Sequence, residues 1–194
     1  MIAIIKYNAG NITSVKNAVE RLGYACKVTD DRDEIVAADK VIFPGVGEAS
    51  SAMNYLKDKG LDKTIASLHQ PVLGICLGLQ LLCNYSEEGH TQCLGIFDTE
   101  VKKFPPLDIV PHMGWNNLYD PKGTLFNGFG KNDTVYFVHG YYAEICADTV
   151  ATCQYILPFS AALQHENFYA TQFHPEKSGN VGEKILKNFL ELIK

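Results

Sequence analysis

The sequence predicts an α/β fold with an open, largely parallel sheet that is flanked by helices. Two observations carry this prediction. Short apolar runs alternate with segments of helical period through the first 84 residues, which is typical of a parallel sheet covered by helices. The second half is rich in strands with little helix between them. We therefore expect a mixed sheet, in which the second half supplies an antiparallel extension.

The first half contains four predicted strands, at residues 2–6, 25–28, 41–43 and 72–75. Apolar residues at helical spacing predict a helix that begins at Thr13 and ends at Gly23. One or two helices, broken at Gly60, are expected over residues 48–68, and another over 77–84. Each predicted strand is therefore followed by a turn or a helix.

The second half is predicted to form strands within residues 94–103, 134–143, 149–156 and 161–173, the last as a hairpin that turns at Glu166-Asn167. The segment FPPLDIVPHMGWN (104–116) carries three prolines and is expected to be a loop. A final helix is expected from Ser178, with Val181, Ile185, Phe189 and Ile193 on one face. Without repeats, low-complexity segments or a linker, residues 1–194 are predicted to be a single domain.

Composition excludes several classes of function. The net charge is −5 and no basic cluster stands out, so nucleic-acid binding is not expected. The apolar run at the N-terminus is too short for a signal peptide and no run is long enough to span a bilayer, which predicts a cytoplasmic protein without membrane contact. Six cysteines form no CxxC pair, so neither a disulfide framework nor a metal site is expected.

The stretch PVLGICLGLQLL (71–82) places Cys76 between Gly74 and Gly78, at the end of a predicted strand and the start of a helix. G-I-C-L-G has the layout of a nucleophile elbow, in which glycines allow close backbone approach. The N-terminus of the following helix stabilises a negative charge on the sulfur, and the Leu77 N–H would face an oxyanion. Taken alone, the pattern is equally compatible with a packed thiol.

A cysteine nucleophile needs a base and a group that orients the base. Of the six histidines, His174 is the best placed, because it follows the predicted strand ATQF and precedes Pro175 and Glu176. Glu176 could fix the ring and stabilise the imidazolium. Upstream, Pro44-Gly45-Val46-Gly47 follows a buried strand at the edge where ligands bind in open α/β sheets, and could supply a second oxyanion donor. Each motif alone is also compatible with an ordinary turn.

Together these motifs resemble the class I (triad) glutamine amidotransferases, which carry a cysteine in GxCxGxQ, a downstream HPE and an earlier glycine-rich loop. Here they stand as GICLGLQ, FHPE and PGVG, in the family's order. The further motifs YNAGN (7–11), PHMGWN (111–116), YFVHGYY (136–142) and HPEKS (174–178) resemble glutaminase subunits of imidazole glycerol phosphate synthases that are carried on a separate chain. The resemblance covers essentially all 194 residues and implies the family's flavodoxin-like fold.

The resemblance implies a role for each matching residue. Cys76 would be the nucleophile, His174 the general base and acid, and Glu176 the residue that orients it. The oxyanion hole would use Gly45, Val46, Gly47 and the Leu77 N–H. Glutamine would be held by Gln80, by Glu88 (with Glu87 as the alternative), and by the backbone of Gly140 and Tyr141. Relatives often have serine or threonine at the position of Gly140, so only backbone contacts are expected there.

The resemblance also implies a reaction and a partner. Glutamine would be hydrolysed through a Cys76 thioester without a cofactor, and the ammonia would pass to a cyclase subunit with a (β/α)₈ barrel in a heterodimer. That partner would make imidazole glycerol phosphate and aminoimidazole carboxamide ribotide in histidine biosynthesis. The residues expected at the docking face and ammonia gate are Lys177, Trp115, His112, Asn11 and Tyr136. We also hypothesise that the PGVG loop rests in an inactive orientation and turns on assembly.

Three other interpretations remain open at this point. The chain could be a triad glutaminase that supplies a different synthase, including a paralogue for sugar modification. It could instead be a regulatory module with a catalytically silent fold, although the intact Cys76, His174 and Glu176 argue against that. A cysteine hydrolase of the related flavodoxin-like type would not explain HPE and Gln80.

Overall fold

The computed structural model describes residues 1–7 and 10–192. Asn8 and Ala9 of the YNAGN motif, and Ile193 of the last predicted helical face, lie outside the described residues. The first half alternates strands and helices as the sequence predicts. Its elements are β1 (Ile2–Ile5), α1 (Ile12–Arg21), β2 (Cys26–Thr29), α2 (Arg32–Ala37), β3 (Lys40–Gly45), α3 (Ala49–Asp58), α4 (Leu61–Ala66), β4 (Val72–Cys76) and α5 (Leu77–Leu82).

The second half is mainly β structure. Its strands are β5 (Cys83–Ser86), β6 (Thr91–Gln92), β7 (Phe97–Lys103), β8 (His112–Asn117), β9 (Thr134–His139), β10 (Tyr141–Ala143), β11 (Thr149–Tyr155), β12 (Leu157–His165) and β13 (Phe168–Thr171). Short 3₁₀ turns lie at Glu88–His90, Thr124–Phe126 and Pro175–Lys177, and α6 (Gly179–Leu190) follows the last of them.

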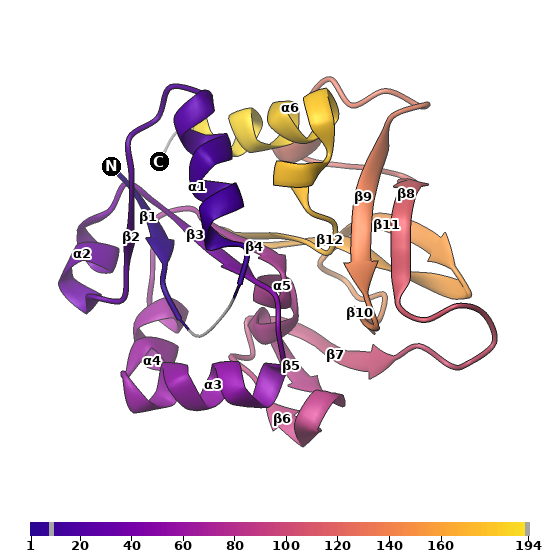
Figure 1. Cartoon of the computed structure of the whole chain (residues 1–194), viewed down its shortest axis with the longest axis horizontal. Coiled ribbons are helices and arrows are strands. Elements are labelled where there is room, and N and C mark those ends of the chain that lie inside the picture. Colours follow the sequence, from indigo (N-terminus) through magenta and orange to yellow (C-terminus); the bar gives the residue numbers. More distant parts are fainter. Residues whose placement is uncertain (8–9, 193–194) are drawn as a thin grey trace.

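The main sheet is mixed, as predicted. Its strand order is β2-β1-β3-β4-β13-β12-β10-β7-β5-β6, with β11 paired to β12. Strands β2, β1, β3, β4 and β13 run parallel to one another, while β12 pairs antiparallel with both β13 and β10 and begins the antiparallel extension. A separate two-stranded sheet, β8-β9, stands beside this extension (Figure 1). The carboxyl ends of β3, β4 and β13 consequently meet at one edge, where PGVG, Cys76 and His174 lie.

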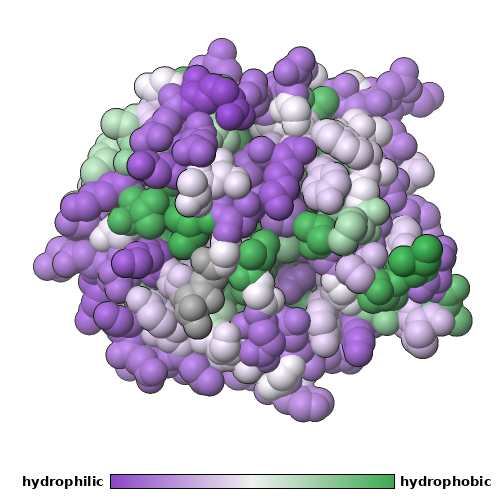
Figure 2. All heavy atoms as spheres, in the orientation of Figure 1, coloured by the Kyte–Doolittle hydropathy of each residue, from purple (hydrophilic) through white to green (hydrophobic). Residues whose placement is uncertain are grey.

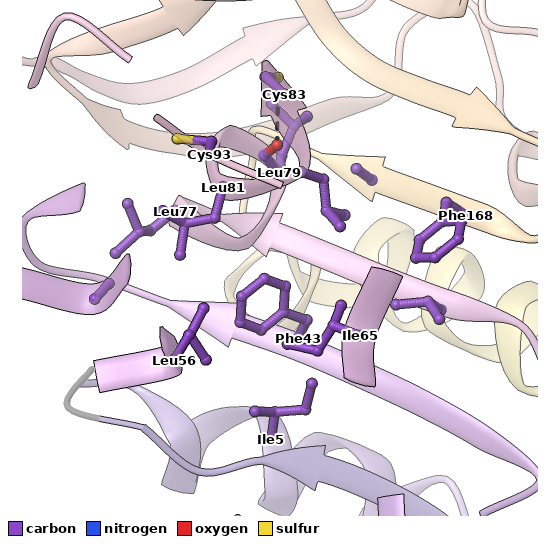
Figure 3. Packing of buried hydrophobic residues seen from close by; sticks show 14 of the residues in the cluster. Ile5, Phe43, Leu56, Ile65, Leu77, Leu79, Leu81, Cys83, Cys93 and Phe168 are labelled. Atoms are coloured by element: carbon purple, nitrogen blue, oxygen red, sulfur yellow. Dashed lines mark hydrogen bonds between the residues drawn. The ribbon is translucent and has the colours of Figure 1, made fainter. Parts of the chain in front are cut away.

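Helices cover both faces of the main sheet (Figure 1). One core cluster joins β1 and β3 to α2, α3, α4 and α5, and Figure 3 shows Phe43 with Leu56, Ile65 and Leu77 around it. The other cluster joins the opposite face to α1, α6 and the aromatic side chains of the β extension. Each of these fully buried large side chains stabilises the fold by about 1.5–3 kcal/mol. The two cores hold the strand ends that carry the site in fixed register.

Three local predictions were wrong and one helix was missed. Helix α1 begins at Ile12 rather than Thr13, because Asn11 adopts a left-handed conformation (φ 68°) that ends the preceding turn. The helix after Cys76 ends at Leu82, because residues 83–86 extend and pair with β7 and β6. The segment 112–117 is strand β8 rather than loop, because it pairs with β9 along its whole length. Helix α2 was not predicted, although Asp31 caps it by accepting from the backbone N–H groups of Asp33 and Glu34.

The last predicted hairpin is confirmed, since β12 and β13 pair with His165 opposite Phe168. Helix α6 follows Ser178 and buries Ile185 and Phe189, as expected from the spacing. Within the described ranges, no helix combines the length and the apolar character that crossing a membrane would require. The cytoplasmic location and the single domain stay predictions.

Candidate active site

Cys76 lies at the junction of β4 and α5 in a backbone conformation that is rare for a residue with a side chain (φ 54°, ψ −107°). This sharp turn is the geometry of a nucleophile elbow. Its flanking glycines are required by close packing. A Cβ on Gly78 would lie 1.8 Å from the carbonyl oxygen of Phe43, and one on Gly74 would lie 3.0 Å from the carbonyl oxygen of Gly78. The glycines therefore let β3, β4 and α5 approach closely enough to hold the turn.

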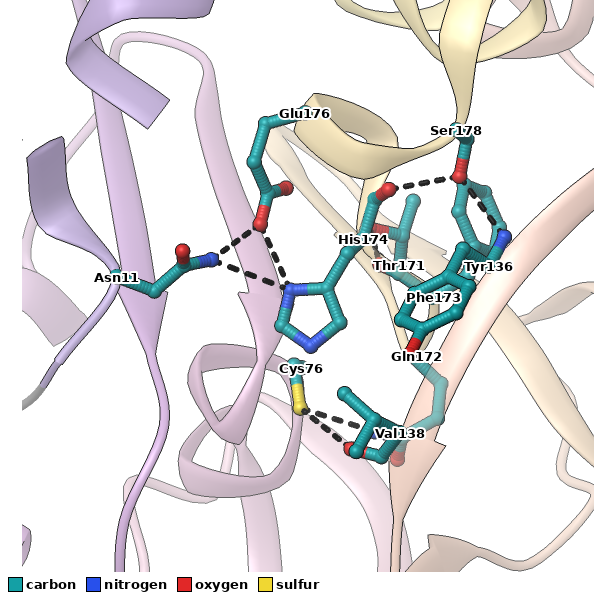
Figure 4. A network of polar contacts seen from close by, with 10 residues as sticks. All are labelled: Asn11, Cys76, Tyr136, Val138, Thr171, Gln172, Phe173, His174, Glu176 and Ser178. Carbon is teal, nitrogen blue, oxygen red and sulfur yellow. Dashed lines mark hydrogen bonds and ion pairs between the residues drawn. The ribbon is translucent and has the colours of Figure 1, made fainter. Parts of the chain in front are cut away.

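His174 and Glu176 meet directly, as the HPE motif predicts. The Nδ1 atom of His174 is 2.8 Å from Oε1 of Glu176, and the two side chains are only 1% and 0% exposed. Within the described part of the chain, Nε2 of His174 has no hydrogen-bond partner, and Figure 4 shows this nitrogen turned toward Cys76. The three side chains thus stand in the order carboxylate, imidazole and sulfur, which is the order of a catalytic triad.

Electrostatics favour a protonated imidazole at this position. Burial alone would lower the pKa of His174. The negative charge of Cys76 and the carboxylate of Glu176 outweigh it, and they raise the pKa to about 10. At neutral pH, His174 is therefore protonated and can donate a proton beside the Cys76 sulfur.

Asn11 belongs to this cluster, although the sequence placed it at the partner interface. Its Nδ2 atom donates a hydrogen bond to Oε1 of Glu176 and lies 3.5 Å from Nδ1 of His174 (Figure 4). Asn11 stands at the N-cap position of α1, but its side chain makes no capping hydrogen bond. Its amide is instead committed to the carboxylate that orients the base.

Ser178 holds the backbone of His174 in place. The Ser178 hydroxyl donates to the carbonyl oxygen of His174 at 2.7 Å and accepts from the Tyr136 N–H at 2.9 Å. The His174 N–H in turn donates to the carbonyl oxygen of Tyr136 at 2.9 Å. These contacts fix the strand end against β9. The sequence analysis named Ser178 only as the start of the last helix and as part of the HPEKS motif, and it gave Ser178 no role in the site.

Gln172 is a second residue that sequence reasoning missed. Its Nε2 atom lies 3.6 Å from Sγ of Cys76, and its Oε1 atom accepts a hydrogen bond from Gln80 at 3.0 Å. Gln172 is fully buried. A signal was present in the sequence, since a buried strand has little use for an amide, and Gln172 stands two residues before His174.

A cavity of about 210 Å³ opens beside the sulfur. Residues predicted to bind substrate or oxyanion contribute most of its wall: Val46, Gly47, Cys76, Leu77, Gln80, Glu88, Gly140 and Tyr141. Pro111, Val138 and His139 complete it. Gly45 does not line the cavity. It pairs with Cys76 across β3 and β4, and a Cβ there would lie 1.8 Å from the hydroxyl oxygen of Tyr7.

The glycine loop is adjacent to the nucleophile, as predicted. Gly47 has φ 130°, a conformation that favours glycine. The carbonyl oxygen of Val46 accepts from the Gly10 N–H at 3.3 Å. The oxyanion role of this loop stays a prediction, as does its reorientation.

Glu88 and Glu87 separate clearly in space. Glu88 borders the cavity, where its Oε2 atom accepts from the Ala49 N–H at 2.9 Å, and burial raises its pKa. Glu87 is exposed and turns toward β7, where its Oε2 atom accepts from the Lys103 N–H at 2.8 Å. Position therefore favours Glu88 as the acid beside a bound substrate.

The other residues expected at the partner interface differ in exposure. Trp115 is 56% exposed and packs edge-on against Tyr136, and Lys177 is exposed at the end of the 3₁₀ turn that follows His174. His112 is 3% exposed and lies beneath the surface, so it is not a direct contact residue of a docking face, and its expected role at the ammonia gate stays a prediction. Its ring is buried because it stacks between Tyr155 and Phe137. In the described ranges, no three His, Cys, Asp or Glu side chains are grouped so as to hold a metal ion.

Comparison with known proteins identifies the class. A family model described as glutamine amidotransferase class-I matches residues 3–193, so the chain belongs to the class I glutamine amidotransferase family. The chain is 60% identical to the imidazole glycerol phosphate synthase subunit HisH of Bacteroides fragilis, over 98% of this chain and 99% of that protein. It is 46% identical to the subunit of the same name from Escherichia coli K12, again over 98% and 99% of the two chains.

Solved structures agree on the fold. A structure described as a glutamine amidotransferase has a TM-score of 0.76 and 19% identity, over 98% of both chains. The structure of PurLQS from Thermotoga maritima has a TM-score of 0.71 and 16% identity, over 100% of this chain and 98% of that one. The family and the mixed α/β fold that the sequence predicts are thereby confirmed.

Proposed function

We propose that this chain is the glutaminase subunit of imidazole glycerol phosphate synthase, which hydrolyses glutamine and passes ammonia to a partner cyclase in histidine biosynthesis. One observation carries the catalytic part of the proposal. The imidazole of His174 is held by Glu176 at 2.8 Å and turns its other nitrogen toward Cys76, at the wall of the cavity. The identity of 46% to 60% to synthase subunits over nearly the whole chain supports the pathway.

The first half-reaction is acyl transfer to the sulfur. The Cys76 thiolate attacks the carboxamide carbon of glutamine, and the oxygen of that group takes the negative charge of the tetrahedral intermediate. The backbone N–H of Leu77 and the Val46-Gly47 segment border this position, and each donor to the oxyanion is worth about 3 kcal/mol in the transition state. The C–N bond then breaks as His174 gives its Nε2 proton to the nitrogen, which leaves as ammonia.

The second half-reaction returns the enzyme to its starting state. His174, now neutral, takes a proton from water, and the resulting hydroxide attacks the γ-glutamyl thioester. The C–S bond breaks, glutamate forms and the thiolate is regenerated. Glu176 stabilises the imidazolium in both halves, while Gln80 and Glu88 border the space for the amino-acid part of glutamine. The cycle needs no cofactor.

The partner proposed for this chain is a cyclase subunit with a (β/α)₈ barrel. An exposed apolar surface supports a docking face beside the site. Leu107, Ile109, Met113 and Trp115 are all more than half exposed, in and after the β7–β8 connection. Figure 2 shows apolar atoms gathered on the right of the molecule, where this connection runs in Figure 1. A surface of this kind is typical of protein interaction sites. With Lys177 and Tyr136 nearby in the fold, it would surround the exit of ammonia.

The test combines two assays of the purified chain. Glutamate release is measured with and without a histidine-pathway cyclase, and imidazole glycerol phosphate is measured with glutamine as the only nitrogen source. A Cys76→Ala variant should lose both activities, whereas the matched Cys26→Ala variant, changed outside the site, should keep them. Full activity of Cys76→Ala would refute the nucleophile. Failure to support this cyclase, with ammonia supplied instead to another synthase, would refute the pathway.

A further inference from the structure

Two buried histidines outside the triad form a hydrogen-bonded pair behind the cavity wall. His112 of β8 and His139 of β9 stand opposite each other in register, and Nδ1 of His112 lies 3.0 Å from Nε2 of His139. Both residues are buried. The reaction outlined above uses neither of them. Packing alone would not require a nitrogen atom of one imidazole ring to point at a nitrogen atom of the other.

The neighbours of the pair fix where each proton lies. Nδ1 of His139 is 2.7 Å from the carbonyl oxygen of Tyr141, which can only accept, so this nitrogen carries the proton. Nε2 of the neutral ring is then an acceptor, and Nδ1 of His112 donates to it. Nε2 of His112 is left as an acceptor, and the Nδ2 atom of Asn116 lies 3.4 Å from it. With this single direction of donation, every hydrogen bond in the series from Asn116 through the two histidines to Tyr141 has one donor and one acceptor.

Both rings stay neutral at the pH of the cytoplasm or of an ordinary assay. Burial lowers the pKa of His112 to about 4. Burial is also the main reason that the pKa of His139 falls to about 3. A second proton on His139 would place two donors face to face in the 3.0 Å contact, and one on His112 would face the amide nitrogen of Asn116. The order of donation is consequently a fixed property of the folded chain.

The carbonyl of Tyr141 connects this pair to the substrate cavity. The same oxygen accepts from Nε2 of Gln80 at 3.0 Å, so His139 and Gln80 hold it from two sides. Gln80 also donates to Oε1 of Gln172, whose Nε2 lies 3.6 Å from the Cys76 sulfur. His139, Tyr141, Gln80 and Cys76 all line the one cavity. Loss of the hydrogen bond from His139 to the Tyr141 carbonyl would therefore disturb the cavity wall first.

We propose that His112 and His139 are positioning residues for glutamine: His112 holds the ring of His139 by donating to its Nε2 atom, and His139 holds the Tyr141 carbonyl where Gln80 requires it. The inference rests on the proposed glutaminase function of the site. Without the His112 donor, Nε2 of His139 is a buried acceptor that has lost its partner. The ring is then no longer held on both sides, so the hydrogen bond from Nδ1 to the Tyr141 carbonyl weakens and that wall moves away from Gln80.

A pair of substitutions at His112 separates this role from packing. The ring of His112 stacks on Tyr155 at 4.1 Å and on Phe137 at 4.7 Å between centroids. His112→Phe keeps the stacking and removes the donor. His112→Asn loses the stacking but places an amide nitrogen where Nδ1 stood. The KM for glutamine, kcat and the melting temperature are measured for each variant in the complex with the cyclase.

The two variants are expected to have opposite effects on the KM for glutamine and on the melting temperature. His112→Phe raises the KM for glutamine about tenfold with little change in kcat, because it disturbs substrate binding rather than the triad. His112→Asn lowers the melting temperature but keeps the KM within about threefold of the wild type. The reverse order, a normal KM for His112→Phe and a raised one for His112→Asn, means that His112 acts by packing and overturns the proposal.

A double variant keeps the proposal testable if either single variant folds poorly. In His139→Asn the amide nitrogen replaces Nδ1 and donates to Tyr141 whatever occupies position 112. Adding His112→Phe to His139→Asn should therefore leave the KM unchanged. A further tenfold rise would contradict the proposal, because His112 would then act on the KM without the ring of His139. Glutamine turnover by the wild type tests the proposed function, and the KM ratios test the pair, so either can fail alone.

Discussion

The carboxylate of Glu176 offers the most informative single change at the site. Glu176→Gln removes one negative charge while keeping an oxygen that can accept from Nδ1 of His174 and from Asn11. The amide nitrogen then occupies the position of Oε2, which has no hydrogen-bond partner among the described residues. Shape and hydrogen-bond reach are nearly unchanged, so the variant reports the contribution of charge.

The magnitude follows from the geometry. A hydrogen bond of 2.8 Å between two buried, oppositely charged groups contributes about 1.5–3 kcal/mol. Since about 1.4 kcal/mol corresponds to one pH unit and to a factor of ten, the pKa of His174 should fall by about one to two units. The intermediate states that need an imidazolium lose the same energy, so kcat should fall about 10- to 150-fold.

The direction in which stability changes with pH also follows from the raised pKa of His174. Because the pKa of His174 is raised from 6.5 to about 10, the ion pair stabilises the fold fully below pH 6.5 and is lost as the pH rises through 10. In Glu176→Gln this loss, and the alkaline limb of the pH–rate profile, should move to lower pH. Steady-state glutaminase assays across pH 6 to 11 (a range set by the value near 10) test this.

The matched control is Glu191→Gln, which makes the same chemical change at an exposed ion pair with Lys187. It should leave kcat and the pH–rate profile as in the wild type, because exposed pairs contribute little. An unchanged alkaline limb and an unchanged kcat in Glu176→Gln would refute the assignment of Glu176 as the group that stabilises the imidazolium.

Three further changes test other parts of the structure. Asn11→Ala should lower kcat about tenfold with little effect on the KM for glutamine, since it removes a donor to Glu176; equal kcat values would contradict this. Gly78→Ala should unfold the chain or lower its melting temperature sharply, because the new methyl meets the Phe43 oxygen at 1.8 Å, whereas Gly130→Ala, with contacts of 3.5 Å and more, should be tolerated. Tyr7→Phe should raise the free energy of unfolding by about 1 kcal/mol in denaturant titrations, because the buried hydroxyl has no hydrogen-bond partner among the described residues; a loss of stability would indicate an undetected partner.

Local sequence signals predicted the elements that carry the chemistry. The glycines around Cys76 predicted the turn, because only residues without a Cβ allow β4 and α5 to pack so closely. The HPE motif predicted the contact of His174 with Glu176, because the two residues are neighbours along the chain. These predictions depend on contacts between residues that are close together in the sequence. Such contacts can be inferred from periodicity and spacing.

Predictions that depended on distant contacts were weaker. Asn11 contacts Glu176 across 165 positions of the chain, and nothing near Asn11 indicates that its amide turns away from its own helix. Strand β8 exists because β9 pairs with it, and this pairing outweighs the prolines before it. His112 looked like a surface residue for the same reason, since its burial is set by Tyr155 and Phe137 on other strands.

The walls of the cavity come from two different sheets. Cys76 stands on a strand of the main sheet, whereas Val138 and His139 belong to the small β8-β9 sheet. The small sheet therefore reaches the substrate space through Val138 and His139, and it reaches the base through the backbone hydrogen bond between Tyr136 and His174. A shift of this one hairpin would consequently change substrate fit and the position of the base together.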